Sequence, residues 1–306
     1  MRSRLKSRWT ISAGVLLLAA LFVGFYVFRH RYVRSDSDMF SLLPAGDATV
    51  CFVDVAQIRR AGMLNLLSGT QPDLEGEYKI FIEQTGFNYA RDIDAAVGWS
   101  DEEQFLLVLR GRFDWTRLNR YASTHGGTCS DDLCRVPSGR PGKMLSFTSI
   151  QPDVLGVALS SDSSAAKLLA PHEGRASIVQ PQEPAWVKLS QTLLRDPTAL
   201  PVPLRIFAIA VQSAESVMIS LGPGPSGNGS LQLKLDASCQ NVAAAETIRN
   251  QLELQTRMLT LELTREHRQA DRADLTGLLT SGTFQVVNRR VVGFWPLHPE
   301  LLKSLE

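Results

Sequence analysis

The sequence predicts an α+β protein: an N-terminal single transmembrane helix followed by a soluble region of two similar units of antiparallel strands packed with helices. Three observations carry this prediction. An uncharged apolar run lies near the start of the chain, strand-like and helical runs alternate from residue 48 onward, and their order is the same in both halves. Hydrophobic residues make up 44% of the 306 residues and charged residues 21%, which is the composition of a folded protein.

The charge balance excludes one class of partner. The formal net charge is +1, and basic and acidic residues are mixed along the chain after residue 34. Nucleic-acid-binding proteins usually carry a basic excess on one face. We therefore expect no nucleic-acid partner.

The run from Ile11 to Phe28 contains no charged residue. As a helix rising about 1.5 Å per residue it spans roughly 27 Å, close to the thickness of a bilayer core. We expect a single-pass transmembrane helix at residues 11–28, with the lipid bilayer as its partner. A basic segment, residues 1–10, precedes it, and a linker, residues 29–40, follows it.

The basic residues on either side of this run favour a cytoplasmic N-terminus, because cytoplasmic flanks carry more Lys and Arg. Four precede the run and three follow it: Arg2, Arg4, Lys6 and Arg8, then Arg29, Arg31 and Arg34. Residues 35–306 are then periplasmic or extracellular. A cleaved signal peptide would need an apolar run of about 7–15 residues and a small-x-small cleavage site, which the flanking FRHRYVR lacks. A buried core helix does not fit between two basic clusters.

The soluble region divides into a first α+β unit (residues 41–172), a connection (173–184) and a second α+β unit (185–306). Hydrophobic periodicity and turn residues place the elements of each unit in the order strand, helix, two strands, helix, two strands, helix. The first unit has strands at 49–55, 93–99, 104–110, 144–150 and 154–159, and helices at 73–85, 114–125 and 163–169. The second has strands at 186–189, 217–221, 231–235, 284–287 and 291–295, and helices at 204–211, 241–267, 274–279 and from 299. The closest local correspondence places Gly156 opposite Gly293.

Two of the four cysteines, Cys129 and Cys134, bracket a loop of four residues. They can pair as a disulfide across this short loop, and an extracytoplasmic compartment would permit it. Free thiols are the main alternative; a metal site is a weaker one, since no second ligand pair is evident. Cys51 lies in an apolar strand and is expected in the core, while Cys239 is assigned no role.

The segment RGRFDW is the most distinctive local cluster. Arg110 and Arg112 are candidates for binding an anion where a strand meets a helix N-terminus. The alternative is that Phe113 and Trp115 pack, Asp114 caps the helix and both arginines are solvated. The sequence favours this alternative, since isolated basic pairs are common on surfaces.

Acidic residues and a histidine near the end of the long helix suggest a metal site only superficially. Glu262, Glu266, His267 and Asp271 form two i,i+4 pairs. Interleaved arginines favour a salt-bridged, solvent-exposed face. We expect no metal site.

No catalytic or cofactor-binding residue stands out. The chain has no Gly-x-Ser-x-Gly elbow and no His-Glu-x-x-His motif. The glycine-rich stretch at residues 222–229 lacks the Gly-Lys-Ser/Thr ending of a phosphate loop. We expect no cofactor, although residues distant in the sequence can still form a catalytic site.

Several short motifs in the first unit resemble those of a known group of proteins. They are LLPA at 42–45, VDV at 53–55, TGFNY at 85–89, RDID at 91–94 and LRGRFD at 109–114. Together with the membrane helix they resemble uncharacterised, membrane-anchored bacterial proteins that are grouped as a domain of unknown function. The resemblance implies a bacterial envelope protein with an α+β ectodomain. It implies no activity.

The sequence therefore supports a non-enzymatic, membrane-anchored envelope protein whose ectodomain contacts an unknown protein partner or gives structural support. The first alternative is a module that binds a lipid or another hydrophobic ligand between the sheets and the apolar helix at 204–211. The second is a hydrolase without a recognisable motif.

Overall fold

The computed structural model describes residues 35–64, 76–171, 181–224 and 230–304. The transmembrane helix predicted from Ile11 to Phe28 lies outside these ranges. None of the helices within them combines the length and the apolar character needed to span a bilayer.

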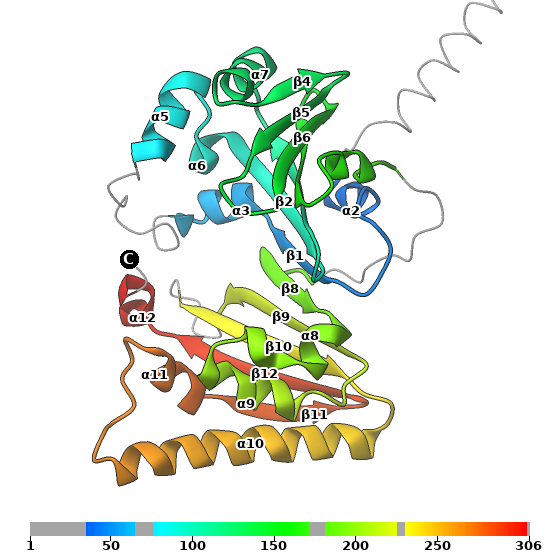
Figure 1. The fold of residues 1–306 in the computed structure, drawn as a ribbon. Helices are drawn as coiled ribbons and strands as arrows, with labels where there is room; N and C mark the ends of the chain where they lie inside the picture. Colours follow the sequence, from blue (N-terminus) through cyan, green and yellow to red (C-terminus); the bar gives the residue numbers. More distant parts are fainter. Residues whose placement is uncertain (1–34, 65–75, 172–180, 225–229, 305–306) are drawn as a thin grey trace, which may run out of the picture.

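A 12-stranded antiparallel sheet runs through both halves of the chain, in the order β11-β12-β10-β9-β8-β1-β2-β3-β7-β6-β5-β4 (Figure 1). The first half contributes β1 (Thr49–Val53), β2 (Ile93–Ser100), β3 (Phe105–Gly111), β4 (Thr128–Ser130), β5 (Leu133–Pro137), β6 (Met144–Gln151) and β7 (Val154–Ser160). The second contributes β8 (Ala185–Leu189), β9 (Ser216–Pro223), β10 (Leu231–Ser238), β11 (Thr283–Val287) and β12 (Arg290–Leu297). The predicted α+β class with antiparallel strands is confirmed.

Most of the helices lie between these strands in the sequence, with α2 before β1 and α12 after β12. Those of the first half are α2 (Asp36–Phe40), α3 (Val55–Arg60), α5 (Gly76–Thr85), α6 (Tyr89–Asp92), α7 (Trp115–Thr124) and the 3-10 helix η1 (Ala165–Leu168). Those of the second half are α8 (Gln191–Arg195), the 3-10 helix η2 (Pro197–Ala199), α9 (Val202–Ala210), α10 (Val242–Arg265), α11 (Leu275–Thr280) and α12 (Pro299–Ser304).

The two halves join where β1 pairs antiparallel with β8. From this seam the sheet runs β1-β2-β3-β7-β6 in one direction and β8-β9-β10-β12-β11 in the other, so the halves share one strand order. The β4–β5 hairpin extends the first half only, at its outer edge. The predicted units are thus parts of one continuous sheet.

The glycines that the sequence places opposite each other lie on different sides of this sheet. Paired residues lead from Gly156 through Val108, Val97, Phe52, Trp186, Ser220 and Lys234 to Phe294. Gly156 therefore shares its side with Phe294, and the adjacent Gly293 faces the other way. An offset of one residue reverses the side on which a strand residue lies, so matching the two segments by sequence alone misplaces the register.

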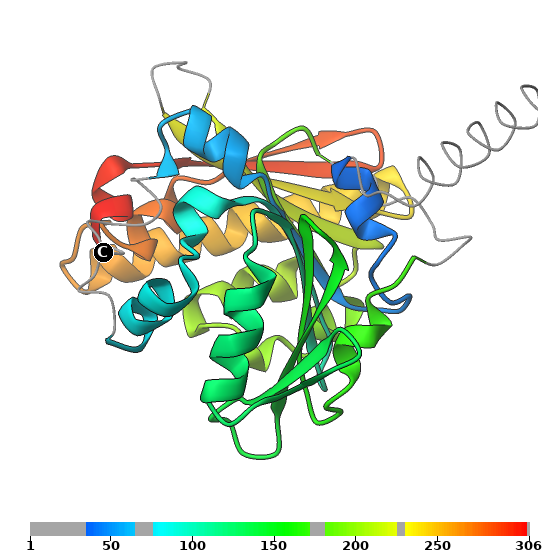
Figure 2. The same ribbon diagram turned by 90° about the horizontal axis from the view of Figure 1, so that it is seen from above.

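Two hydrophobic cores stabilise the sheet. The first includes Val50, Val97 and Val108 from the strands together with Met39, Phe40, Ala165 and Ala166 from α2 and η1. Figure 2 shows the blue α2 and the green η1 on the same side of the strands of the first half, with α6 and α7 on the other. The second core lies among α8–α11 and β9–β12, with Leu194, Phe207, Ile248 and Leu279 among its members.

The linker expected over residues 29–40 is shorter than the sequence indicates. Asp36–Phe40 form α2, in which Met39 is 0% and Phe40 7% exposed. The polar Ser-Asp-Ser-Asp sequence has the composition of a linker, yet here it starts a helix. Ser35 and Asp38 form a reciprocal capping box at its N-terminus, and this pairing stabilises the first turn.

Candidate functional site

Arg110 and Arg112 do not converge on a common anion site. Arg110 extends from β3 to Asp36 in α2, with 2.6 Å between guanidinium and carboxylate. Arg112, which follows β3, lies 3.3 Å from Asp92 instead. Each positive charge already has a carboxylate of this chain beside it, which weighs against capture of a free anion.

The rest of RGRFDW is engaged in packing and capping. The side chain of Asp114 accepts a hydrogen bond from the backbone N–H of Arg117 and caps α7. Phe113 stacks on Phe87 with 5.6 Å between ring centroids, and Trp115 donates its indole N–H to the Pro152 carbonyl. Packing and capping are as the alternative interpretation of the cluster predicts, but the expectation that both arginines are solvated is wrong for Arg110, whose side chain is only 22% exposed and pairs with Asp36.

Asp92 is the charged residue that sequence reasoning did not single out. It is 6% exposed and accepts hydrogen bonds from the backbone N–H of Asn88 and from the guanidinium of Arg91. Those bonds from Arg91 hold the pKa of Asp92 below its ordinary value. The only sequence signal was the alternation of charge in RDID. The cluster fastens α6 to the end of β3 and leaves the Asp92 carboxylate engaged within the chain.

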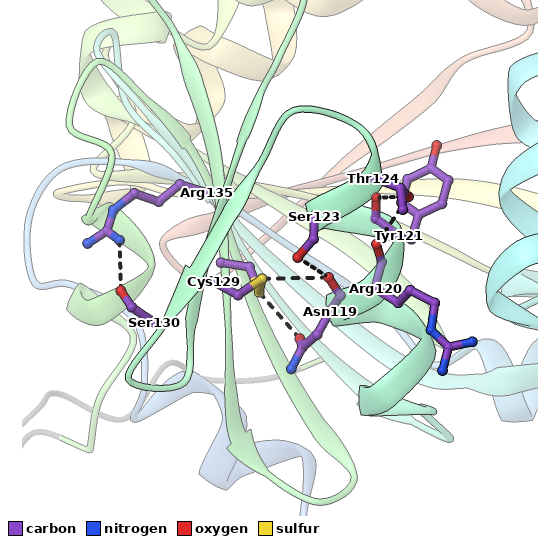
Figure 3. The surroundings of a disulfide bond; sticks show 9 residues. Asn119, Arg120, Tyr121, Ser123, Thr124, Cys129, Ser130 and Arg135 are labelled. Atoms are coloured by element: carbon purple, nitrogen blue, oxygen red, sulfur yellow. Dashed lines mark hydrogen bonds between the residues drawn. A yellow bond between two sulfur atoms is a disulfide. The ribbon is translucent and has the colours of Figure 1, made fainter.

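Cys129 and Cys134 form a disulfide between the directly paired positions of β4 and β5. The turn between them places Asp131 and Asp132 at φ values of 50° and 62°, a left-handed conformation that Asp tolerates better than most residues. The sulfur atoms lie against Asn119 of α7, as Figure 3 shows. The bond therefore closes an edge hairpin beside a helix, where it has a structural role.

The acidic residues around the end of α10 do not form a metal site. Glu266 pairs with Arg268 at 3.3 Å, and the carboxylate of Asp271 accepts a hydrogen bond from the backbone N–H of Ala273. His267 already follows the helix, at φ 55°. Within the ranges that the structure describes, no group of three or more His, Cys, Asp or Glu side chains could hold a metal ion.

A polar cavity of about 720 Å³ lies at the seam between β1 and β8. Its lining includes five acidic residues, Asp47, Asp101, Glu102, Glu103 and Asp196, and several hydroxyls, among them Thr49, Ser100, Ser190 and Thr192. Burial raises the pKa of Asp47, but hydrogen bonds from Gln191 and Thr192 outweigh burial and leave it lowered. The Asp47 carboxylate is thus used to hold the start of α8.

A second polar cavity, of about 540 Å³, lies over β9 and β10. Its charged residues are paired: Lys234 lies 3.0 Å from Glu183, and Arg290 donates to Asp236. In the first cavity the Thr192 hydroxyl donates a hydrogen bond to Asp47, but that carboxylate also accepts the backbone N–H groups of Gln191 and Thr192, and no His, Lys or Cys is among the described lining residues. The first cavity thus uses its carboxylate to cap a helix, and the second pairs its charges, so neither supports the hydrolase alternative.

The hydrophobic-ligand alternative expects a space between the sheets and the apolar helix at 204–211. That segment belongs to α9, and its Phe207, Ala210 and Val211 are each at most 8% exposed. Phe207 makes an edge contact with Trp295 in the second core. Side chains of the chain itself fill this place.

The most distinctive surface feature is an apolar stripe on α10, formed by Leu254, Met258 and Leu261. These side chains are 50%, 55% and 67% exposed. Their i, i+4, i+7 spacing places them on one side of the helix. Ala245, Ile248, Leu252 and Leu263 are buried on the opposite side. The helix is apolar on both sides, whereas its position at the surface requires only one apolar side.

Fold and site together define a class: an α+β protein built on a continuous antiparallel sheet, with an exposed apolar helix stripe as its principal surface feature. No protein-family model matches the chain, and no curated protein matches it. Among solved structures, crystal form I of TP0453 is 12% identical, covers 89% of this chain and 98% of its own, and superposes with a TM-score of 0.46. Crystal form IV of TP0453 is 11% identical, covers 88% of this chain and 96% of its own, and superposes with a TM-score of 0.43. Likenesses this distant carry no argument about function.

Proposed function

We propose that this chain is a single-pass, membrane-anchored envelope protein without enzymatic activity, whose extracytoplasmic domain binds a protein partner through the α10 stripe. The observation that carries the proposal is the exposure of Leu254, Met258 and Leu261. A contiguous apolar patch on a soluble surface is typical of a contact site. Helix anchors at i, i+4 and i+7 are the pattern with which an amphipathic helix enters an apolar groove.

The anchor from Ile11 to Phe28 and the resemblance of the first half to membrane-anchored bacterial proteins support the envelope location. The engagement of Arg110, Arg112, Asp47 and Asp92 within the chain supports a binding role over catalysis. These polar groups hold helices to the sheet, which leaves the apolar stripe as the better-supported contact.

Site-specific photo-crosslinking of the full chain in its native host tests the proposal. A photoreactive residue at Met258 is expected to give a discrete protein adduct, while the same residue at the exposed Arg120 of α7 gives none. The double substitution Leu254→Ser and Leu261→Ser should abolish the Met258 adduct. An adduct with a second copy of the chain would identify the partner as the protein itself. Equal labelling from both positions, or none, would contradict the proposal.

A further inference from the structure

Helix α2 starts immediately beyond the short basic segment that follows the predicted anchor, yet it is part of the core. Phe40 stacks on Trp186 of β8, with 5.4 Å between ring centroids and 16° between ring planes. Met39 and Leu42 are completely buried. The carboxylate of Asp36 lies 2.6 Å from the Arg110 guanidinium of β3. Contacts with β3 and β8 thus fix the position of residue 36 relative to the sheet.

The connection from the anchor to this fixed point is short. Residues 29–34 lie between Phe28 and Ser35. Fully extended, a chain covers about 3.6 Å per residue, so Phe28 and Ser35 are at most roughly 25 Å apart. The headgroup layer on each side of a bilayer core takes up about 5–8 Å of that distance. The start of α2 then lies within roughly 20 Å of the headgroup surface.

We infer that the bilayer surface covers the end of the domain that carries α2 and η1, and that α10 faces away from the membrane; this inference rests on the membrane anchor of the proposed function. The exposed residues at this end include Ser37 of α2 and Lys167 and Leu168 of η1, and Leu168 is 45% exposed. A lysine beside an exposed leucine suits the boundary between phosphate groups and acyl chains.

The two acidic side chains of α2 repel anionic headgroups less than free carboxylates would, because both are engaged within the chain. Asp36 pairs with Arg110, and Asp38 accepts a hydrogen bond from the backbone N–H of Ser35. In the sequence Arg29, Arg31 and Arg34 follow the predicted anchor directly, and basic residues at such positions favour anionic headgroups.

The α10 stripe lies at the far end of the sheet. Five strand spacings separate β1 from β11, about 24 Å at 4.8 Å each. Helix α10 packs against β11 and β12. Figure 1 shows it along the outer edge of the second half, away from α2, which lies on the flank of the first half. The orientation therefore presents Leu254, Met258 and Leu261 to the extracytoplasmic compartment. A protein partner that is soluble, or that is held in a facing membrane, can reach them there.

Fluorescence quenching on the full chain in vesicles of phosphatidylcholine and phosphatidylglycerol tests the orientation. A fluorescent unnatural amino acid replaces the exposed Ser37 in one variant and the exposed Gln251 of α10 in another, so no cysteine chemistry is needed. Lipids spin-labelled at the headgroup should quench the Ser37 position several-fold more strongly than Gln251. Equal quenching, or stronger quenching at Gln251, would overturn the inference while leaving the anchor intact. Failure of the protein to float with the vesicles would instead overturn the anchor and, with it, this inference.

Lengthening the tether gives a second, independent measurement. Gly-Ser repeats inserted between Arg34 and Ser35 should lower the quenching at Ser37 step by step. The same insertion in the β11–β12 turn, between Asn288 and Arg289, should leave it unchanged. Quenching at Ser37 that does not respond to tether length would show that the anchor does not set the position of the domain.

Discussion

Phe40 and Trp186 stack across the seam of the sheet, with ring planes 16° apart and centroids 5.4 Å apart. Phe52 of β1 completes the cluster, 5.7 Å from Phe40 and 5.9 Å from Trp186. One ring comes from the first helix after the predicted anchor, one from β1 and one from β8. The contact therefore connects the anchor-proximal segment to both halves of the domain.

Replacing Phe40 with Ala should destabilise the domain by about 3 kcal/mol, because the substitution leaves a cavity among buried aromatic rings. Urea unfolding of residues 35–306, followed by tryptophan fluorescence, measures the change in the free energy of unfolding. The matched control is Ser37→Ala in the same helix, on its exposed side, which should change stability by less than about 0.5 kcal/mol. A loss below 1 kcal/mol for the Phe40 variant would show that α2 is not part of the folded core.

The disulfide between Cys129 and Cys134 closes a very short loop. In the chain-entropy model, such a loop contributes about 2 kcal/mol, so the double substitution Cys129→Ser and Cys134→Ser should lower stability by that amount. Reduction of the native protein should have the same effect and should leave the double variant unchanged. Alkylation trapping in cells should find the pair oxidised if the domain is extracytoplasmic; free thiols throughout would argue against that location.

Asp92 should make stability depend on acid pH. Because Arg91 lowers the folded-state pKa of Asp92 below 3.8, the unfolded chain takes up this proton first as the pH falls. The stabilisation is complete above the unfolded pKa of about 3.9 and is lost as the pH falls through the folded value. Asp92→Asn should cost about 1–3 kcal/mol at pH 7 and flatten the acid limb of the stability curve.

The matched control for Asp92 is Glu102→Gln, on the exposed turn between β2 and β3, which should change stability by less than about 0.5 kcal/mol at pH 7. Part of the acid sensitivity should persist in the Asp92 variant, because the pKa values of Asp47 and Asp274 are also lowered. Equally steep acid limbs in the Asp92→Asn and wild-type proteins would contradict the assignment.

A Leu→Ala substitution should change the stability of the domain by very different amounts on the two sides of α10. Leu252 is 1% exposed, and Leu252→Ala should cost about 2–5 kcal/mol through the cavity it leaves. Leu261 is 67% exposed, and Leu261→Ala should change stability by less than about 0.5 kcal/mol while weakening the proposed partner contact. Thermal unfolding measures the two changes in stability, and the yield of the photo-crosslink at Met258 measures the partner contact. A large stability loss at Leu261 would mean that the stripe serves the fold.

The sequence alone determined the α+β class and most elements, because these depend on local patterns. Short apolar runs separated by a polar turn define the strands at 93–99 and 104–110, and the structure places β2 and β3 there. Asp114 and Asn241 cap the helices that they are predicted to start. Local patterns did not reveal the β4–β5 hairpin or the short helices α8 and η2, since three to five residues carry too little periodicity.

The tertiary structure decided what depends on distant partners. It made Asp36–Phe40 a core helix, because Phe40 stacks on Trp186 and Asp36 pairs with Arg110, and both partners are far along the chain. It separated Arg110 from Arg112 by giving each a different aspartate, and it placed Gly156 and Gly293 on opposite sides of the sheet. It also showed that Leu254, Met258 and Leu261 face outward, since a helical repeat gives the spacing of apolar residues and only packing shows which ones are covered.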